Sequence, residues 1–284
     1  MGRTHAERLR ADGRGIVAAV YDSDRLAAEQ LEQAVAPGAA VFNDLHALLT
    51  SGLAQAAIIC TPTTSHFEQA VACLERGLDV LCEKPLAATR AEIVELIERA
   101  RGPGPKLMVA YQRRFWSVYR TLRRDLRSRK WGGVRAVLSH NAENWLQVYR
   151  GTWRDDPAAN FGGFIGDAGS HKIDAVFYTT GLAPVDVFAR CDTCGSRVEV
   201  TASVSAVLSG NVPLTMDFIG NAQHFGEHLH IHCAEADLIV QGETLWIARD
   251  QRVERYDSLE PETNPVAGFL DLRQFGRYVL NRRC

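Results

Sequence analysis

Apolar and polar residues alternate in blocks along the first 112 residues. Short apolar runs, typical of strands buried on both faces, are separated by longer segments whose apolar residues recur at helical spacing. The predicted strands are residues 15–22, 39–44, 55–62, 78–85 and 105–112. The predicted helices between them are residues 24–36, 65–77 and 90–101, with a brief helix after residue 44. Strands that alternate with helices predict βαβ units and a doubly wound parallel sheet in an α/β fold.

Polar residues at the ends of these segments mark where helices begin and end. Ser65 precedes an apolar-periodic segment and Gly77 follows it, so we expect the first to cap that helix and the second to stop it. Thr89 and Glu92 have the spacing of a capping box, in which each side chain bonds the other residue's backbone N–H.

The pattern changes after residue 112. Two helix-like segments, residues 117–128 and 166–181, flank a predicted strand over residues 133–145. Residues 184–257 then contain many short alternating runs separated by turn residues. This half therefore predicts an α+β domain with a largely antiparallel open sheet, one face of which packs on helices.

These patterns divide the chain in two. We expect a nucleotide-type domain over residues 1–112 and an α+β domain over residues 113–284. A chain of 284 residues is long enough for two modest domains, each with its own core.

Composition excludes several classes of partner and site. The net charge of −2 gives no electrostatic reason to bind nucleic acid or a membrane surface. No apolar run approaches the roughly 20 residues that span a bilayer. The seven cysteines are an odd count and stand mostly in apolar runs, which favours reduced thiols in a cytoplasmic protein over a disulfide framework.

Gly2 and Asp22 have the spacing of a dinucleotide fingerprint. Its last glycine opens a helix, and an acid about 20 residues later bonds the ribose hydroxyls. Gly2 and Asp22 are 22 − 2 = 20 positions apart, and Asp22 ends a predicted strand. The signal is weak by itself because acids commonly end strands.

The sequence "CEKP", residues 82–85, places Glu83 and Lys84 at the end of a predicted parallel strand. Ligands bind at this end of strands in α/β sheets. A lysine there stabilises an alkoxide as it forms on a substrate. A surface ion pair before a proline turn is the alternative, and spacing alone favours it.

In "GDAGSH", Asp167 and His171 are four residues apart on a predicted helix and therefore share a face. A carboxylate beside an imidazole fixes the ring for acid/base work. Asp174 lies one turn further along. An Asp–His pair on a helix surface is an equally good interpretation of this spacing.

The segments "CDTC" (191–194) and "HLHIHC" (228–233) contain the residue types of a zinc site. In a strand, however, His228, His230 and His232 share one face and extend too far along it to converge on one ion. We therefore expect exposed or interface-facing histidines and no metal.

Four motifs occur in a specific order: "TPTTSH", "EKPLA", "YQRRF" and "GDAGSH" followed by Asp174. Together they resemble the glucose–fructose oxidoreductase / inositol dehydrogenase (Gfo/Idh/MocA) family over nearly the whole chain. The resemblance implies a Rossmann domain that binds NAD(H) or NADP(H), followed by an α/β domain that supplies the substrate pocket and often a dimer surface.

The resemblance also implies site residues. Lys84 would contact the nicotinamide ribose and the reacting hydroxyl, His171 would be the acid/base, and Asp167 would be its neighbour. The residues implied to bind the cofactor are Gly2, Asp22, Thr61, Pro62, His66, Glu83, Lys84, Gln112 and Arg113. Asp22 favours NAD over NADP because its charge repels a 2′-phosphate. The faces of Trp145 and Trp153 suit stacking on sugar C–H groups, although packing is the commoner role of a tryptophan.

The implied function is hydride transfer between a sugar or cyclitol hydroxyl and a nicotinamide, in a homo-oligomer, either a dimer or a tetramer. Two alternatives stay open. Some members of the family are NAD-assisted glycosidases, and a truncated, non-catalytic remnant would keep the same motifs.

Within the resemblance, Met1 and Gly2 align with the last two residues of a loop of the form G-x-G-x-M-G. The first strand and most of the glycine loop would then lie upstream, so we expect a Rossmann sheet without its central strand. A late-assigned start or a lost upstream segment would explain this. The neighbours of the absent strand would face each other across a gap.

Overall fold

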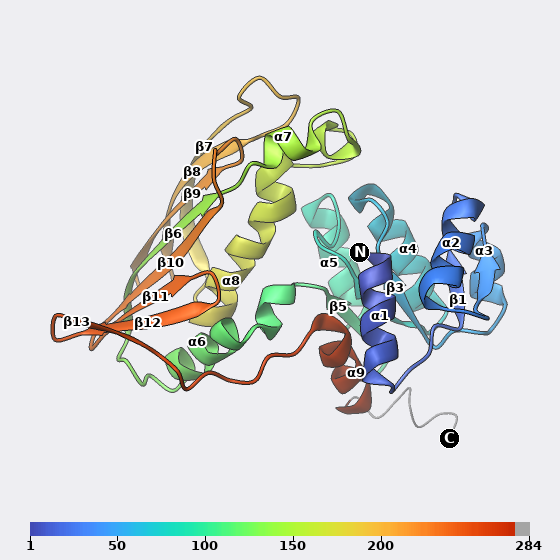
Figure 1. Ribbon diagram of the computed structural model, residues 1–284, viewed down its shortest axis with the longest axis horizontal. Helices are drawn as coiled ribbons and strands as arrows, with labels where there is room; N and C mark the ends of the chain where they lie inside the picture. Colours follow the sequence, from blue (N-terminus) through green and yellow to red (C-terminus); the bar gives the residue numbers. More distant parts are fainter. Residues whose placement is uncertain (276–284) are drawn as a thin grey trace. The chain divides into compact units, whose positions relative to one another are not determined.

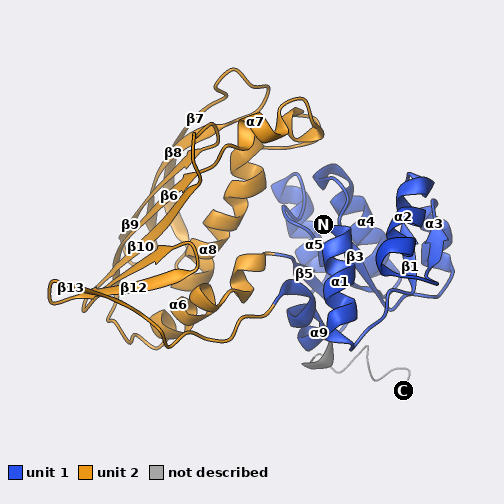
Figure 2. Ribbon diagram, in the orientation of Figure 1, with its two compact units in different colours: residues 1–110, 264–284 blue, residues 111–263 orange. Residues whose placement is uncertain are grey.

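The computed structural model describes residues 1–275, and the side chains up to residue 272. The chain forms two compact units (Figure 2): unit 1 comprises residues 1–110 together with the segment from Asn264 onward, and unit 2 comprises Tyr111–Thr263. The first boundary lies near the predicted one, but the assignment of the C-terminal segment differs from the prediction.

The segment from Asn264 joins unit 1 because helix α9 (Pro265–Phe275) buries an apolar face there. Val266, Phe269 and Leu270 pack with Leu81 and Ala110 in one hydrophobic cluster. Local periodicity does not reveal which domain a helix will cover, so the sequence did not indicate that this C-terminal helix packs in unit 1.

Unit 1 contains the predicted alternation of strands and helices (Figure 1). Its strands are β1 (Ala19–Tyr21), β2 (Ala40–Phe42), β3 (Ala56–Ile59), β4 (Asp79–Cys82) and β5 (Leu107–Val109). Its helices, besides α9, are α1 (Gly2–Asp12), α2 (Arg25–Val35), α3 (Leu45–Thr50), α4 (Thr63–Glu75) and α5 (Arg90–Arg99). All paired strands are parallel. The Rossmann-type fold is therefore confirmed.

The strands of unit 1 form two sheets, β1-β2 and β3-β4-β5. Among the described residues, no strand joins β1 to β3, which is the discontinuity expected at the centre of the sheet. Helix α1 packs against both β3 and α2. It therefore contacts elements on both sides of that discontinuity.

The helix ends in unit 1 show which polar residues act as caps. The capping box of α5 is present: Thr89 N donates to Glu92 Oε2 at 2.9 Å and Glu92 N donates to Thr89 Oγ1 at 3.3 Å. The prediction that Ser65 caps α4 is wrong, because the helix begins two residues earlier, directly after the extended Pro62. Gly77, at φ 75°, follows the end of α4 as expected.

Unit 2 is built on an eight-stranded sheet of order β13-β12-β11-β10-β6-β9-β8-β7. Its strands are β6 (Val134–Ala142), β7 (Pro184–Asp192), β8 (Thr201–Leu208), β9 (Val212–Ile219), β10 (Gly226–Cys233), β11 (Asp237–Gln241), β12 (Thr244–Arg249) and β13 (Arg252–Arg255). Neighbours are antiparallel except for the parallel pair β6–β9. The largely antiparallel open sheet is confirmed.

Helices cover one face of this sheet (Figure 1). They are α6 (Ser117–Arg127), α7 (Trp145–Tyr149) and α8 (Ser170–Thr180), with the short turns η1 (Gln112–Phe115), η2 (Trp153–Asp155) and η3 (Ile165–Gly169). Leu214, Met216 and Phe218 of β9 are buried in the core cluster that includes residues of α6 and α8. Residues between them, such as Thr215, lie on the opposite face and are more exposed.

No helix within residues 1–275 is both long enough and apolar enough to cross a membrane.

Candidate active site

Four of the predicted cofactor residues of unit 1 follow the carboxyl ends of two adjacent parallel strands. Strand β3 leads to Thr61 and Pro62, and strand β4 leads to Glu83 and Lys84. The two strands are in register, with Ile59 paired to Cys82. These residues therefore lie at the edge of the sheet where α/β folds bind ligands.

Glu83 is buried and held by a histidine that the sequence analysis did not identify. His5 Nε2, on α1, lies 2.7 Å from Glu83 Oε1, and the backbone N–H of Lys84 donates to Glu83 Oε2 at 3.3 Å. Burial raises the pKa of Glu83, but the His5 hydrogen bond and the charges of His5 and Lys84 outweigh it and lower the pKa overall. The carboxylate is therefore kept ionised.

His66 bridges the two strand-end segments from helix α4. Its Nδ1 lies 2.8 Å from the carbonyl oxygen of Pro85, and its Nε2 lies 2.8 Å from that of Thr61. The residue is 1% exposed. Its ring therefore faces the protein interior, which does not favour the predicted direct contact with a cofactor.

Asp22 is exposed directly after β1, as the fingerprint requires. Its Oδ1 accepts the backbone N–H of Asp24 at 3.0 Å. Gly2 begins α1, but a Cβ added there would meet only Leu31 Cδ2, at 3.8 Å. That is an ordinary contact, so close packing does not demand a glycine at this position.

Asp167 and His171 lie where two helical geometries join. The predicted continuous α-helix is instead a π-helical turn, η3, that runs into α8. Tight backbone packing accompanies the irregularity: a Cβ on Gly166 would lie 2.1 Å from the carbonyl oxygen of Phe161, and one on Gly163 would lie 2.1 Å from that of Glu199. Single π-turns within helices occur frequently at functional sites.

Asp167 is 8% exposed and accepts two hydrogen bonds at Oδ2. The donors are Trp145 Nε1 and Arg154 Nε, each at 3.0 Å. Arg154, in η2, was not identified from the sequence. The two donors, one in α7 and one in η2, fix the orientation of the carboxylate.

His171 packs against Tyr111. Their ring centroids are 6.0 Å apart at an interplanar angle of 82°. The guanidinium of Arg114 lies 5.3 Å from the Tyr111 ring centroid and is bonded twice to Asp174, at 2.9 and 2.5 Å. Burial, together with the negative charge of Asp174, raises the pKa of Tyr111 to about 12. Tyr111 therefore stays protonated near neutral pH.

The two candidate substrate tryptophans differ in exposure. Trp145 is 2% exposed and packs against Tyr149 and Phe164, at centroid distances of 5.6 and 5.9 Å. The structure therefore favours packing over substrate stacking for Trp145. Trp153 is 40% exposed, and the guanidinium of Arg154 lies 4.3 Å from its ring centroid.

Arg113, which is expected to approach the nicotinamide, has a buried side chain in η1. Its guanidinium is buried and paired through both terminal nitrogens with Glu227, with Nη2–Oε2 at 2.7 Å, and it also donates to the Tyr119 hydroxyl at 2.8 Å. The buried Lys172 completes the group, with Nζ 2.9 Å from Glu227 Oε2 and 3.0 Å from Glu143 Oε1. Gln112, in η1, is half-buried.

Glu227 is the centre of this buried ion cluster. Burial raises its pKa, but the charges of Arg113 and Lys172 outweigh it and lower the pKa overall. Sequence reasoning missed Glu227 and Lys172. The available signal was a charged residue within the apolar pattern of a strand, for Glu227, or of a helix, for Lys172. Such a residue does not by itself identify its partner.

The histidines of β10 share one face, as predicted. His228, His230 and His232 are half-buried, whereas Leu229, Ile231 and Cys233 between them are buried. His232 Nδ1 lies 2.9 Å from Asp237 Oδ1. All six cysteines in the described part of the chain are free thiols.

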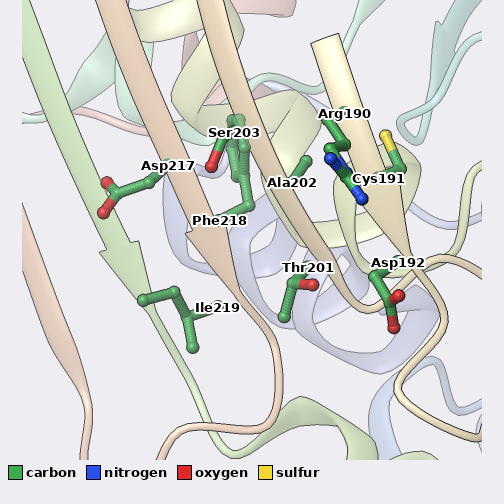
Figure 3. A pocket seen from close by; sticks show the side chains of 9 residues that line it. All are labelled: Arg190, Cys191, Asp192, Thr201, Ala202, Ser203, Asp217, Phe218 and Ile219. Carbon is green, nitrogen blue, oxygen red and sulfur yellow. The ribbon is translucent and has the colours of Figure 1, made fainter.

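A pocket of about 300 Å³ lies on strands β7, β8 and β9 (Figure 3). Its lining includes Arg190, Ser203 and Asp217, which occupy one row across the three strands. It contains none of the predicted site residues.

Two family models match the chain. Residues 1–111 match the Gfo/Idh/MocA oxidoreductase family, NAD-binding Rossmann fold. Residues 119–239 match a C-terminal domain of the same family. The two matches agree with the division into two units near residue 110.

Individual relatives agree with these models. Inositol 2-dehydrogenase 2 of Saccharopolyspora erythraea is 33% identical over 194 residues, which are 67% of this chain and 54% of that protein. The crystal structure of an oxidoreductase domain protein from Kribbella flavida has a TM-score of 0.84 at 25% identity, over 94% of this chain and 80% of that one.

A levoglucosan dehydrogenase solved with NADH and levoglucosan has a TM-score of 0.84 at 17% identity, over 99% of this chain and 87% of that one, a likeness of fold alone. The chain spans about half the length of the curated relatives that it matches first, 47% and 54%.

Proposed function

Because this chain belongs to the Gfo/Idh/MocA oxidoreductase family, we propose that it transfers a hydride between a hydroxyl of a sugar or cyclitol and the nicotinamide of NAD(H). One observation carries the proposal beyond family membership. The Glu83–Lys84 pair follows β4 at the ligand-binding end of the parallel sheet, with Glu83 buried and kept ionised.

Several features of unit 1 fit a dinucleotide. The N-terminus of α1 has no side-chain cap, so its first N–H groups and its dipole suit a pyrophosphate. Asp22 is exposed after β1, where its carboxylate would bond ribose hydroxyls and repel a 2′-phosphate. We therefore infer NAD rather than NADP. Thr61 and Pro62 would line the same edge, and Gln112 would approach the nicotinamide.

The cofactor would supply the hydride acceptor or donor, and this chain's own residues would bind the alcohol and move its proton. We assign Lys84 to stabilise negative charge on the reacting oxygen. We assign His171 to accept or return the hydroxyl proton. Asp167, four residues earlier in the turn that runs into the same helix, would be its neighbour in the site. A positioned base of this kind contributes on the order of 10²–10⁴ in rate.

Trp153 is the better candidate for substrate contact of the two tryptophans. Its ring is partly exposed, and Arg154 lies over it while also bonding Asp167. A substrate that stacks on Trp153 would therefore lie close to Arg154, which orients Asp167. This link supports a role in substrate binding rather than packing alone.

We also infer a homo-oligomer in a cytoplasmic setting. The face of the large sheet opposite the helices carries exposed apolar side chains, with Leu138 45% and Phe188 73% exposed. A second copy of this chain would cover them. The free thiols of the described cysteines are consistent with a reducing compartment.

A fluorescence titration with NADH, followed by turnover assays with NAD and a panel of cyclitols and sugars, tests the proposal. We expect saturable binding and reduction of NAD by at least one polyol. Alanine at Lys84 or His171 should lower turnover by about 10²–10⁴. A folded protein that binds no cofactor up to millimolar concentration would overturn it. Cleavage of a chromogenic glycoside without net NAD reduction would favour the glycosidase alternative.

A further inference from the structure

We propose that His5 and His66 act together as a clamp that positions Lys84. The two residues come from different helices, α1 and α4, and hold consecutive parts of the Glu83–Pro85 turn. The inference deepens the proposed function and rests on its assignment of Lys84 to the reacting oxygen. Neither histidine is a catalytic residue in this scheme, because each is only 1% exposed.

His5 acts through the Glu83 side chain. One carboxylate oxygen is 2.7 Å from His5 Nε2, and the other accepts the backbone N–H of Lys84 at 3.3 Å. The Glu83 carboxylate thus links helix α1 to the main chain of Lys84. A hydrogen bond to an ionised group is about twice as strong as a neutral one, which makes this link rigid.

His66 acts on the other side of Lys84, through the main chain. Its two ring nitrogens lie 2.8 Å from the carbonyl oxygens of Pro85 and Thr61. Both partners are main-chain carbonyl oxygens, so each end of the ring contacts the backbone of a different segment. The ring thereby ties the segment after β4 to the segment after β3.

The two contacts have a common consequence. Residues 83 and 85 are held by buried partners, while Lys84 between them is only half-buried. The backbone of Lys84 is therefore fixed from both sides, and its side chain starts from one defined position. A displacement of about 1 Å at such a position is enough to lower a rate about 10²-fold.

Amide hydrogen exchange tests the clamp without any assay of activity. We expect His5→Phe and His66→Phe each to speed exchange at the Lys84 amide at least tenfold. His5→Gln, which keeps a donor toward Glu83, should restore most of the protection. His46→Phe is the matched control, because His46 is exposed on α3 of the same unit and should change nothing. Unchanged exchange in both phenylalanine variants would overturn the proposal.

Kinetics then separate positioning from general stability. We expect His5→Phe and His66→Phe to lower kcat at least tenfold while KM for the polyol stays within threefold, at a temperature where circular dichroism shows both variants folded. His5→Gln should recover most of kcat. A loss confined to melting temperature, with kcat unchanged, would overturn the positioning role.

The two measurements also distinguish this inference from the proposed function. If the parent protein turns over no polyol but Lys84 exchange responds to both histidines, the clamp stands and the dehydrogenase assignment fails. If the parent is active and exchange does not respond, the clamp fails and the dehydrogenase assignment stands.

Discussion

The imidazole of His171 and the phenol ring of Tyr111 stand nearly perpendicular, with their centroids 6.0 Å apart. This is the preferred edge-to-face geometry of an aromatic pair. Arg114, bonded to Asp174 on the helix of His171, lies over the same tyrosine ring. The candidate base is therefore oriented by a ring that is itself held in place.

Replacing Tyr111 tests this relationship. Tyr111→Leu removes the ring edge, so we expect kcat for the polyol to fall about tenfold, which is part of the roughly 10²–10⁴ that a positioned base contributes. Tyr111→Phe keeps the ring and should stay within threefold of the parent. Equal losses in the two variants would show that the hydroxyl, not the ring, is what matters.

Removing the anion of the buried cluster should destabilise unit 2. Glu227→Ala leaves Arg113 and Lys172 buried without their shared carboxylate. Breaking a buried ion pair in this way costs about 3–5 kcal/mol of unfolding free energy. Urea denaturation measures the loss. Glu235→Ala, at an exposed position, should change the free energy by no more than about 0.5 kcal/mol.

The lowered pKa of Glu227 predicts a loss of stability in acid. The folded-state pKa lies below the ordinary glutamate value of 4.5, so the unfolded chain binds more protons as pH falls below 4.5. The contribution of Glu227 to the free energy of unfolding is therefore fully present above pH 4.5. It is lost as pH falls through the pKa that Glu227 has in the folded protein. Urea denaturation from pH 7 to 3 should show a smaller decline in Glu227→Gln than in the parent.

Substitutions of Trp145 and Trp153 should distinguish a role in positioning Asp167 from a role in substrate binding. Trp145→Phe removes the indole N–H that bonds Asp167 but keeps a buried ring, so we expect kcat to fall while KM stays within threefold. Trp153→Ala removes an exposed ring, and we expect KM to rise at least threefold with a smaller change in kcat. Steady-state kinetics with the best polyol measure both. A rise in KM for Trp145→Phe would contradict the packing role.

Local signals in the sequence predicted most of the elements. The alternation of apolar runs with helical periods predicted the parallel strands of unit 1. The short alternating runs after residue 184 predicted the open sheet of unit 2. The capping box of Thr89 and Glu92 was predicted from spacing alone, because both partners lie within one helical turn. The face shared by the β10 histidines follows from the two-residue period of a strand.

Only the tertiary structure decided which distant residues are partners. His5 meets Glu83 across 78 positions, and Arg113 meets Glu227 across 114. No local period encodes such a pair, because folding brings together side chains whose sequence neighbours obey separate patterns. The same reason explains why α9 packs in unit 1 and why Arg113 is buried in an ion pair. The sequence determined the elements and the motifs, and the packing of those elements determined which charged and polar side chains hold the motifs in place.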